Sequence, residues 1–141
     1  MVEQIVLDTF ILGRISAAGF TGWSEVVPED VLSNAVAVSF GQVGDAEVVW
    51  IQDGKKVVGW NFTKIITVHG ADNQGKIPWE ELELIHATFD VEGPTWTINH
   101  ASGVYALVCD RIGVKPLAIS REGVQSMQAM ATYRFKLRKQ E

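Results

Sequence analysis

The feature that most constrains the fold is a strict alternation of apolar and basic residues near the end of the chain. Three large apolar residues alternate with three basic ones: Tyr133, Arg134, Phe135, Lys136, Leu137 and Arg138. A period of two residues is typical of a β-strand with one buried and one exposed face. We therefore expect a strand inside a sheet, its apolar face in the core and its basic face forming a positive stripe.

A second strong local signal lies in the segment 46–62. Asp53-Gly54 separates two β-prone runs, and this dipeptide favours a two-residue hairpin turn because both of its residues tolerate positive φ. The register set by that turn places Trp50 opposite Val57 on one face of the hairpin. Val49 and Val58 then pair on the other face. Both faces are apolar, which indicates a sheet covered on both sides or a contact between subunits.

The rest of the chain reads as short strands separated by turn signals. Strands are expected at 35–40, 64–69, 95–100, 103–109, 116–119 and 127–139. Segment 2–12 is interpreted as a strand, with a helix as the alternative, and 79–85 is open between a helical turn and an alternating strand. A short helix is expected at 28–32. Loops or turns are expected at 13–23, 70–78, 93–94, 111–115 and 120–123, the last with a short helix through Met127 as its alternative.

Such spacing predicts a mainly β protein, an antiparallel sandwich or barrel-like single domain with one or two short helices. An α+β fold is the alternative. The 141 residues suit one β-rich domain over 1–141, and 47% hydrophobic and 21% charged residues are values of globular proteins. We see no signal peptide and no apolar run long enough for a membrane span, so a cytoplasmic or virion location is expected.

Charge and cysteine content narrow the function classes. A net charge of −5 makes a nucleic-acid partner a poor expectation, because such proteins normally carry a clear basic patch. Cys109, the single cysteine, lies in an apolar strand-like run and is interpreted as a buried, inert thiol. There is no nucleotide-binding glycine loop and no serine-nucleophile elbow. We predict no cofactor and no metal.

Two H-x-[ST] triplets are the best enzymatic signal. His86-Ala87-Thr88, within Ile85–Phe89, resembles the strand motif of two-histidine phosphoesterases, and His100-Ala101-Ser102 would be the second copy. The resemblance implies that the two imidazoles act as base and acid while Thr88 and Ser102 hold a phosphate. The triplets stand 14 residues apart, closer than in that family. With His69, the two histidines could instead form a zinc site.

Interface candidates come from charge and from aromatic residues in loops. Trp23 and Trp79 lie in turn-rich surroundings, where tryptophan serves as an interface anchor. An acidic cluster includes Glu80, Glu81 and Glu83, and it could complement the basic stripe Arg134, Lys136 and Arg138 of a neighbouring copy. The alternative is that both are solvated surfaces.

These observations favour a non-enzymatic structural subunit that self-associates or joins other subunits of an assembly. Small β-domains commonly build viral or phage particles, as tube, capsid or decoration subunits, and this analogy operates at the level of fold. The alternatives are a small phosphoesterase-like enzyme that uses the two H-x-[ST] triplets and a regulatory module that binds a small ligand.

Overall fold

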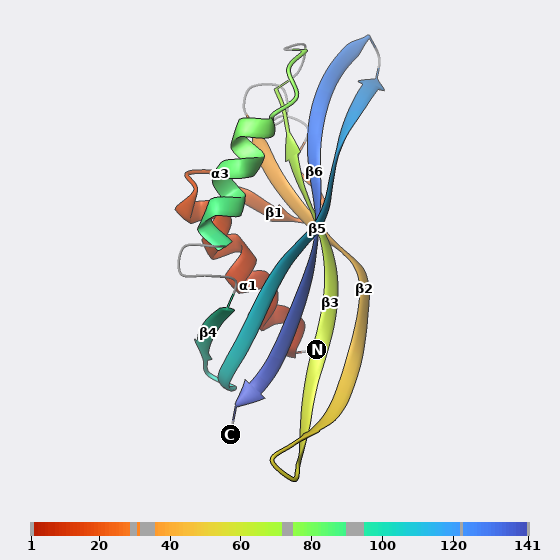
Figure 1. Ribbon diagram of the computed structural model, residues 1–141. Helices are drawn as coiled ribbons and strands as arrows, with labels where there is room; N and C mark the ends of the chain where they lie inside the picture. The colour runs from red at the N-terminus through yellow and green to blue at the C-terminus, as the bar shows by residue number, and fades with distance from the viewer. Residues whose placement is uncertain are drawn as a thin grey trace.

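In its described residues, the protein forms one curled β-sheet with the helices α1 and α3 on one face (Figure 1). The computed structural model describes residues 2–28, 31, 36–71, 75–89, 95–121 and 123–140, without the side chains of 46, 48–50, 52, 57 and 121. The helices are α1 (Val2–Ala17) and α3 (Trp79–Phe89). The strands are β1 (Gly22–Ser24), β2 (Ala37–Gln52), β3 (Lys55–His69), β4 (Thr95–His100), β5 (Gly103–Arg121) and β6 (Val124–Gln140).

The sheet has the order β1-β2-β3-β6-β5-β4, in which only the β1–β2 pair is parallel. It curls into a half-barrel, so the expectation of a mainly β, barrel-like domain is confirmed. The described strands are fewer and longer than expected. Two hairpins, β2–β3 and β5–β6, project beyond the helices at opposite ends of the molecule (Figure 1).

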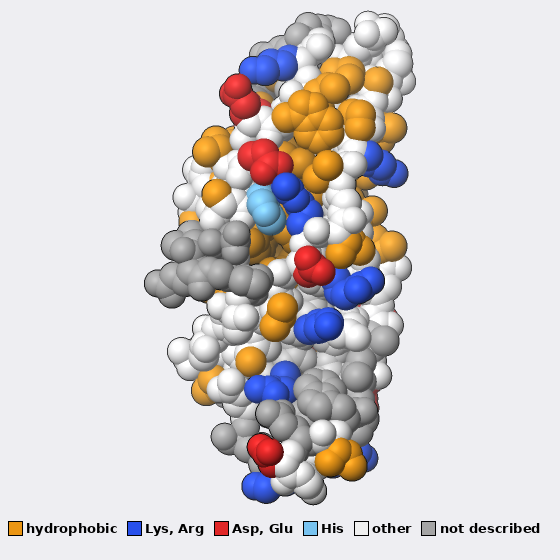
Figure 2. Space-filling view, viewed as in Figure 1, with side chains coloured by type: hydrophobic (Ala, Val, Ile, Leu, Met, Phe, Trp, Pro, Cys, Tyr) orange, Lys and Arg blue, Asp and Glu red, His pale blue; other side chains and the backbone are white. Residues whose placement is uncertain are grey.

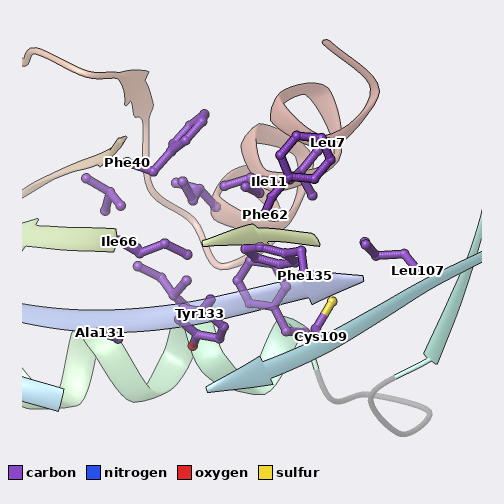
Figure 3. Packing of buried hydrophobic residues seen from close by; sticks show 14 of the residues in the cluster. Leu7, Ile11, Phe40, Phe62, Ile66, Leu107, Cys109, Ala131, Tyr133 and Phe135 are labelled. Carbon is purple, nitrogen blue, oxygen red and sulfur yellow. The ribbon is translucent and has the colours of Figure 1, made fainter. Parts of the chain in front are cut away.

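The alternating segment that ends the chain lies at the centre of the sheet. Strand β6 pairs with β3 on one side and with β5 on the other. Tyr133, Phe135 and Leu137 are at most 1% exposed and pack beneath the helices with residues such as Phe62 and Leu107 (Figure 3). The expected core face of this strand is therefore confirmed.

The hairpin turn at Asp53-Gly54 is also confirmed. Both residues have positive φ, 53° and 74°, and Trp50 pairs with Val57 and Val49 with Val58 in the backbone register. The hairpin extends further in both directions than expected. It includes the strand expected at 64–69 and, of the strand expected at 35–40, residues 37–40; Val36 precedes the strand, and residue 35 lies outside the described residues.

The strand expected at 2–12 is wrong, and its alternative, a helix, is observed. Helix α1 buries Leu7, Ile11 and Ile15, which recur every four residues and form one stripe against the sheet. This stripe continues past Gly13, where the sequence pattern suggested a loop. The helix ends at Ala17 and is capped by Gly19, whose φ is 90°, with hydrogen bonds from Phe20 N–H to the Ile15 carbonyl and from Gly19 N–H to the Ser16 carbonyl.

Segment 79–85 resolves as the start of helix α3. Leu82, Ile85 and Phe89 are buried, a spacing of three and four residues, whereas Leu84 is 56% exposed. Glu80 and Glu81 lie in the first turn, where the helix dipole favours negative charge. The alternation seen in the sequence is therefore incidental to the fold.

In the last third of the chain one expected break is wrong, and one alternative does not form. The turn at 111–115 is a β-bulge within β5, where the register with β6 shifts between Arg111 and Gly113. The short helix through Met127 does not form, because β6 begins at Val124 directly after the hairpin turn. The helix expected at 28–32 and the turn at 93–94 lie mostly or wholly outside the described residues, although Val31 is helical.

Candidate functional site

The two H-x-[ST] triplets do not come together. His86 lies on helix α3, and its Nδ1 is 2.8 Å from the Tyr133 hydroxyl. His100 ends β4 and pairs in register with Gly103, next to the pairing of Val104 with Gln140. Tyr133 and Gln140 are seven residues apart on β6, or about 23 Å along a strand. One phosphate group cannot touch both imidazoles, so the phosphoesterase-like alternative loses its geometric basis.

The hydroxyl groups of the triplets serve local structure. Thr88 Oγ1 donates to the Ile85 carbonyl at 2.7 Å within its own helix. Ser102 Oγ lies 2.8 Å from His100 Nδ1 and 2.9 Å from the Tyr105 hydroxyl, which closes the turn between β4 and β5. His86 keeps Tyr133 tied to α3, and burial raises the pKa of that tyrosine.

A third histidine forms a network that the sequence did not suggest. His69 Nε2 is 2.8 Å from Ser39 Oγ, and the Gln128 amide nitrogen is 2.8 Å from His69 Nδ1. Because the amide donates to Nδ1, the ring proton is on Nε2 and is donated to Ser39. His69 therefore offers Ser39 no base, and the network joins β2, β3 and β6. Among the described residues, no cluster of His, Cys, Asp and Glu has the form of a metal site.

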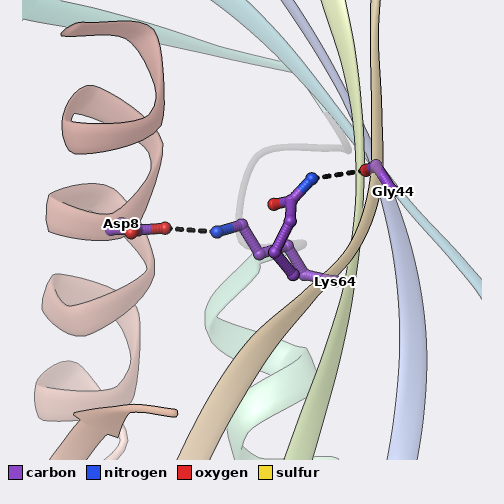
Figure 4. Close-up of polar contacts among 4 residues, drawn as sticks. Asp8, Gly44 and Lys64 are labelled. Atoms are coloured by element: carbon purple, nitrogen blue, oxygen red, sulfur yellow. Dashed lines mark hydrogen bonds and ion pairs between the residues drawn. The ribbon is translucent and has the colours of Figure 1, made fainter. Parts of the chain in front are cut away.

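A buried ion pair connects helix α1 to the sheet. Lys64 is 3% exposed on the helix-covered face, and its Nζ lies 2.5 Å from Asp8 of α1 (Figure 4). Asp8 is the oppositely charged partner that a buried ammonium group requires. The sequence does not indicate this pair as long as 2–12 is taken as a strand, because Asp8 then has no reason to lie over Lys64. A helical reading of 2–12, with Asp8 beside Leu7 and Ile11, would have placed it near the sheet.

Cys109 is buried in the sheet, as expected. Its thiol packs on the core face of β5, and burial raises its pKa to about 12. The thiolate is the reactive form, so this cysteine is unsuited to nucleophilic chemistry at neutral pH.

The expected acidic partner of the basic stripe is partly engaged within the chain. Glu83 Oε1 accepts from Arg111 at 2.7 Å, an ion pair between α3 and β5. Glu80 is exposed at the start of α3, and Glu81 is half-buried beside it. Trp79, at the first position of the helix, is 36% exposed, whereas Trp23 is half-buried in β1.

The basic stripe lies on the sheet face opposite the helices. Arg134 and Lys136 are exposed, and Arg138 is half-buried and has an interaction partner. Their register neighbours on β5 include Val108, which is 38% exposed and lies opposite Lys136. Hydrophobic side chains also gather at the end where the β5–β6 hairpin projects, beyond the scattered charges (Figure 2). In the same hairpin, Val114 and Leu117 of β5 are 51% and 43% exposed.

Comparisons with known proteins identify no family. No protein-family model and no curated protein matches the chain. One similar solved structure is a chain described as "Virion of native gene transfer agent (GTA) particle". The match covers 89% of this chain and 84% of that chain, with 10% identity and a TM-score of 0.41. A likeness of this degree carries no argument about function. No described helix has the length and apolar character needed to cross a membrane.

Proposed function

We propose that the protein is a non-enzymatic structural subunit that associates with further copies of itself, as a building block of a larger assembly such as a viral or phage particle. The tube, capsid and decoration roles all belong to this proposal. The observation that carries it is the projecting β2–β3 hairpin. Nothing among the described residues favours the small-ligand alternative.

We call Gly44–Gly59 of this hairpin the arm: its base, at 44–48, pairs with residues of β3 that also pair with β6, and its projecting part is 49–58. Strand β1 covers the outer edge of β2 only from Val38 to Phe40. Pairing of β3 with β6 stops at Gly59. Within the described part of the chain, the two strands at 49–58 therefore pair only with each other.

Two-stranded hairpins are marginal in water unless a third strand or another surface supports them. The arm contains a markedly apolar sequence, with four consecutive apolar residues at 48–51 and two more at 57–58. Ile51, close to its tip, is 76% exposed. Burying Ile51 against another subunit would stabilise both the arm and the assembly by the hydrophobic effect.

The test is the effect of one charged residue on the arm. Ile51→Lys should shift the protein toward smaller species in size-exclusion chromatography with light scattering, because a charge would have to be desolvated in the interface. Val26→Lys is the matched control, since Val26 is also 76% exposed but lies in the loop after β1. A wild-type protein that is strictly monomeric at high concentration and at several salt levels would contradict the proposal.

A further inference from the structure

The sheet face opposite the helices offers a surface with a definite chemistry. Arg134 and Lys136 project from this face two residues apart on β6. In register, Lys136 lies between Asn61 and Val108, neither of which neutralises it, while Arg134 lies between Thr63 and Asp110. Val104, opposite Gln140, is 37% exposed. We call Arg134, Lys136, Val104 and Val108 the basic face.

The arm has the opposite character. Strand β2 contains no basic residue, and its two acids, Asp45 and Glu47, are both exposed. Asp45 and Glu47 pair in register with Phe62 and Trp60. They therefore lie, together with Ile51, on the side of the sheet opposite the basic face, which is the side that carries the helices. The nearest basic residue on β3 is Lys56, which lies opposite Ile51 in register. The row Asp45, Glu47 and Ile51 is therefore acidic at one end and apolar at the other.

The two surfaces match in spacing and, at Lys136, in charge, whereas Arg134 shares its face with the exposed Asp110 opposite it. Asp45 and Glu47 are two residues apart, as are Arg134 and Lys136, which corresponds to about 7 Å along each strand. Ile51 follows Glu47 by four residues. Val104 lies opposite Gln140, four residues beyond Lys136. In one alignment the two acids meet the two bases, and Ile51 meets Val104.

The geometry points to a specific contact between copies: the arm of one molecule docks, through Asp45, Glu47 and Ile51, on the basic face of a second molecule. This inference rests on the proposed function and names its interface. In this contact, Asp45 and Glu47 take the place of Glu83 as acidic partners of the basic stripe, since Glu83 forms an ion pair with Arg111. Because the two surfaces differ, the contact closes a two-fold dimer when two copies exchange arms, and it generates a ring or a filament when it propagates head-to-tail.

A charge swap tests the contact. Arg134→Glu with Lys136→Glu should raise the dissociation constant of the assembly at least tenfold, and Asp45→Lys with Glu47→Lys should do the same. Combining all four substitutions should restore assembly. Mixing the two double variants should also restore a contact, because a reversed arm then meets a reversed face. Circular dichroism of each variant checks that the fold is intact.

Matched controls separate this contact from general charge effects. Lys76→Glu with Lys115→Glu changes the net charge by the same amount as the variant of the basic face, and Glu25→Lys reverses an exposed acid outside the arm; both should leave assembly unchanged. Assembly that ignores the swaps would overturn the inference while the proposed function stands. A monomeric wild-type protein would overturn both. Loss of DNA binding in Arg134→Glu with Lys136→Glu, with assembly unchanged, would assign the basic face to nucleic acid and overturn the inference.

Discussion

At the scale of single residues, several polar side chains of the interior have defined hydrogen-bond partners. His69 illustrates this, because both of its ring nitrogens are used by neighbouring strands. The pKa of His69 is lowered from 6.5, and the cause is burial. A protonated ring would also present a second N–H to the amide of Gln128, which is itself a donor.

This arrangement predicts a pH dependence of stability. With its folded-state pKa below 6.5, His69 binds fewer protons in the folded than in the unfolded protein. The contribution of His69 to the free energy of unfolding should therefore be complete above pH 6.5. It should be lost as the pH falls below that value toward the folded-state pKa. Urea unfolding between pH 4 and 8 measures this. In the variant His69→Gln, the free energy of unfolding should depend less on pH in this range. An unchanged pH dependence would contradict the role given to His69.

At the scale of elements, helix α1 shows how two glycines in one segment play opposite roles. Gly13 lies inside the helix, and a Cβ added there would meet nothing within 4 Å. Gly19 ends the helix with a φ of 90°, and a Cβ there would also meet open space. Space is thus equal at the two sites, and only the backbone conformation differs.

The two alanine substitutions should therefore change stability in opposite directions. Gly13→Ala should raise the free energy of unfolding by about 0.5–1 kcal/mol, since alanine loses less entropy in a helix. Gly19→Ala should lower it by about 1 kcal/mol, because the left-handed conformation is strained for an L side chain. Denaturant unfolding of both variants measures the difference. Destabilisation by Gly13→Ala would mean that α1 does not pass through residue 13 as a regular helix.

At the scale of the whole molecule, the covered side of the sheet and the surfaces open to a partner lie in different places. The helices cover one face of the sheet, while the arm and the basic face remain open to a partner. If acids of one copy meet bases of another, salt must weaken the assembly, because exposed charges are screened over about 10 Å at 0.1 M. We expect the dissociation constant to rise roughly tenfold between about 0.05 and 0.5 M sodium chloride. Light scattering across this range checks it, and tighter assembly in high salt would indicate a purely apolar contact.

Sequence alone determined the features that depend on neighbours along the chain. The alternation at 133–138 reports a strand because side chains of a strand point alternately to its two faces. Asp53-Gly54 specified both a turn and a register, since positive φ is a property of single residues. The strand expected at 2–12 is a helix, because a short apolar run suits either element and its local pattern does not decide between them.

Tertiary structure alone decided which distant residues meet. It separated His86 from His100, joined Lys64 to Asp8, joined His69 to Ser39 and engaged Glu83 with Arg111. Those outcomes follow from strand order and from the placement of helices on one face. Both arise from packing over the whole chain rather than from any local pattern. Charge along the sequence marked the basic stripe, but only the sheet showed which face it occupies and which acids remain free to meet it.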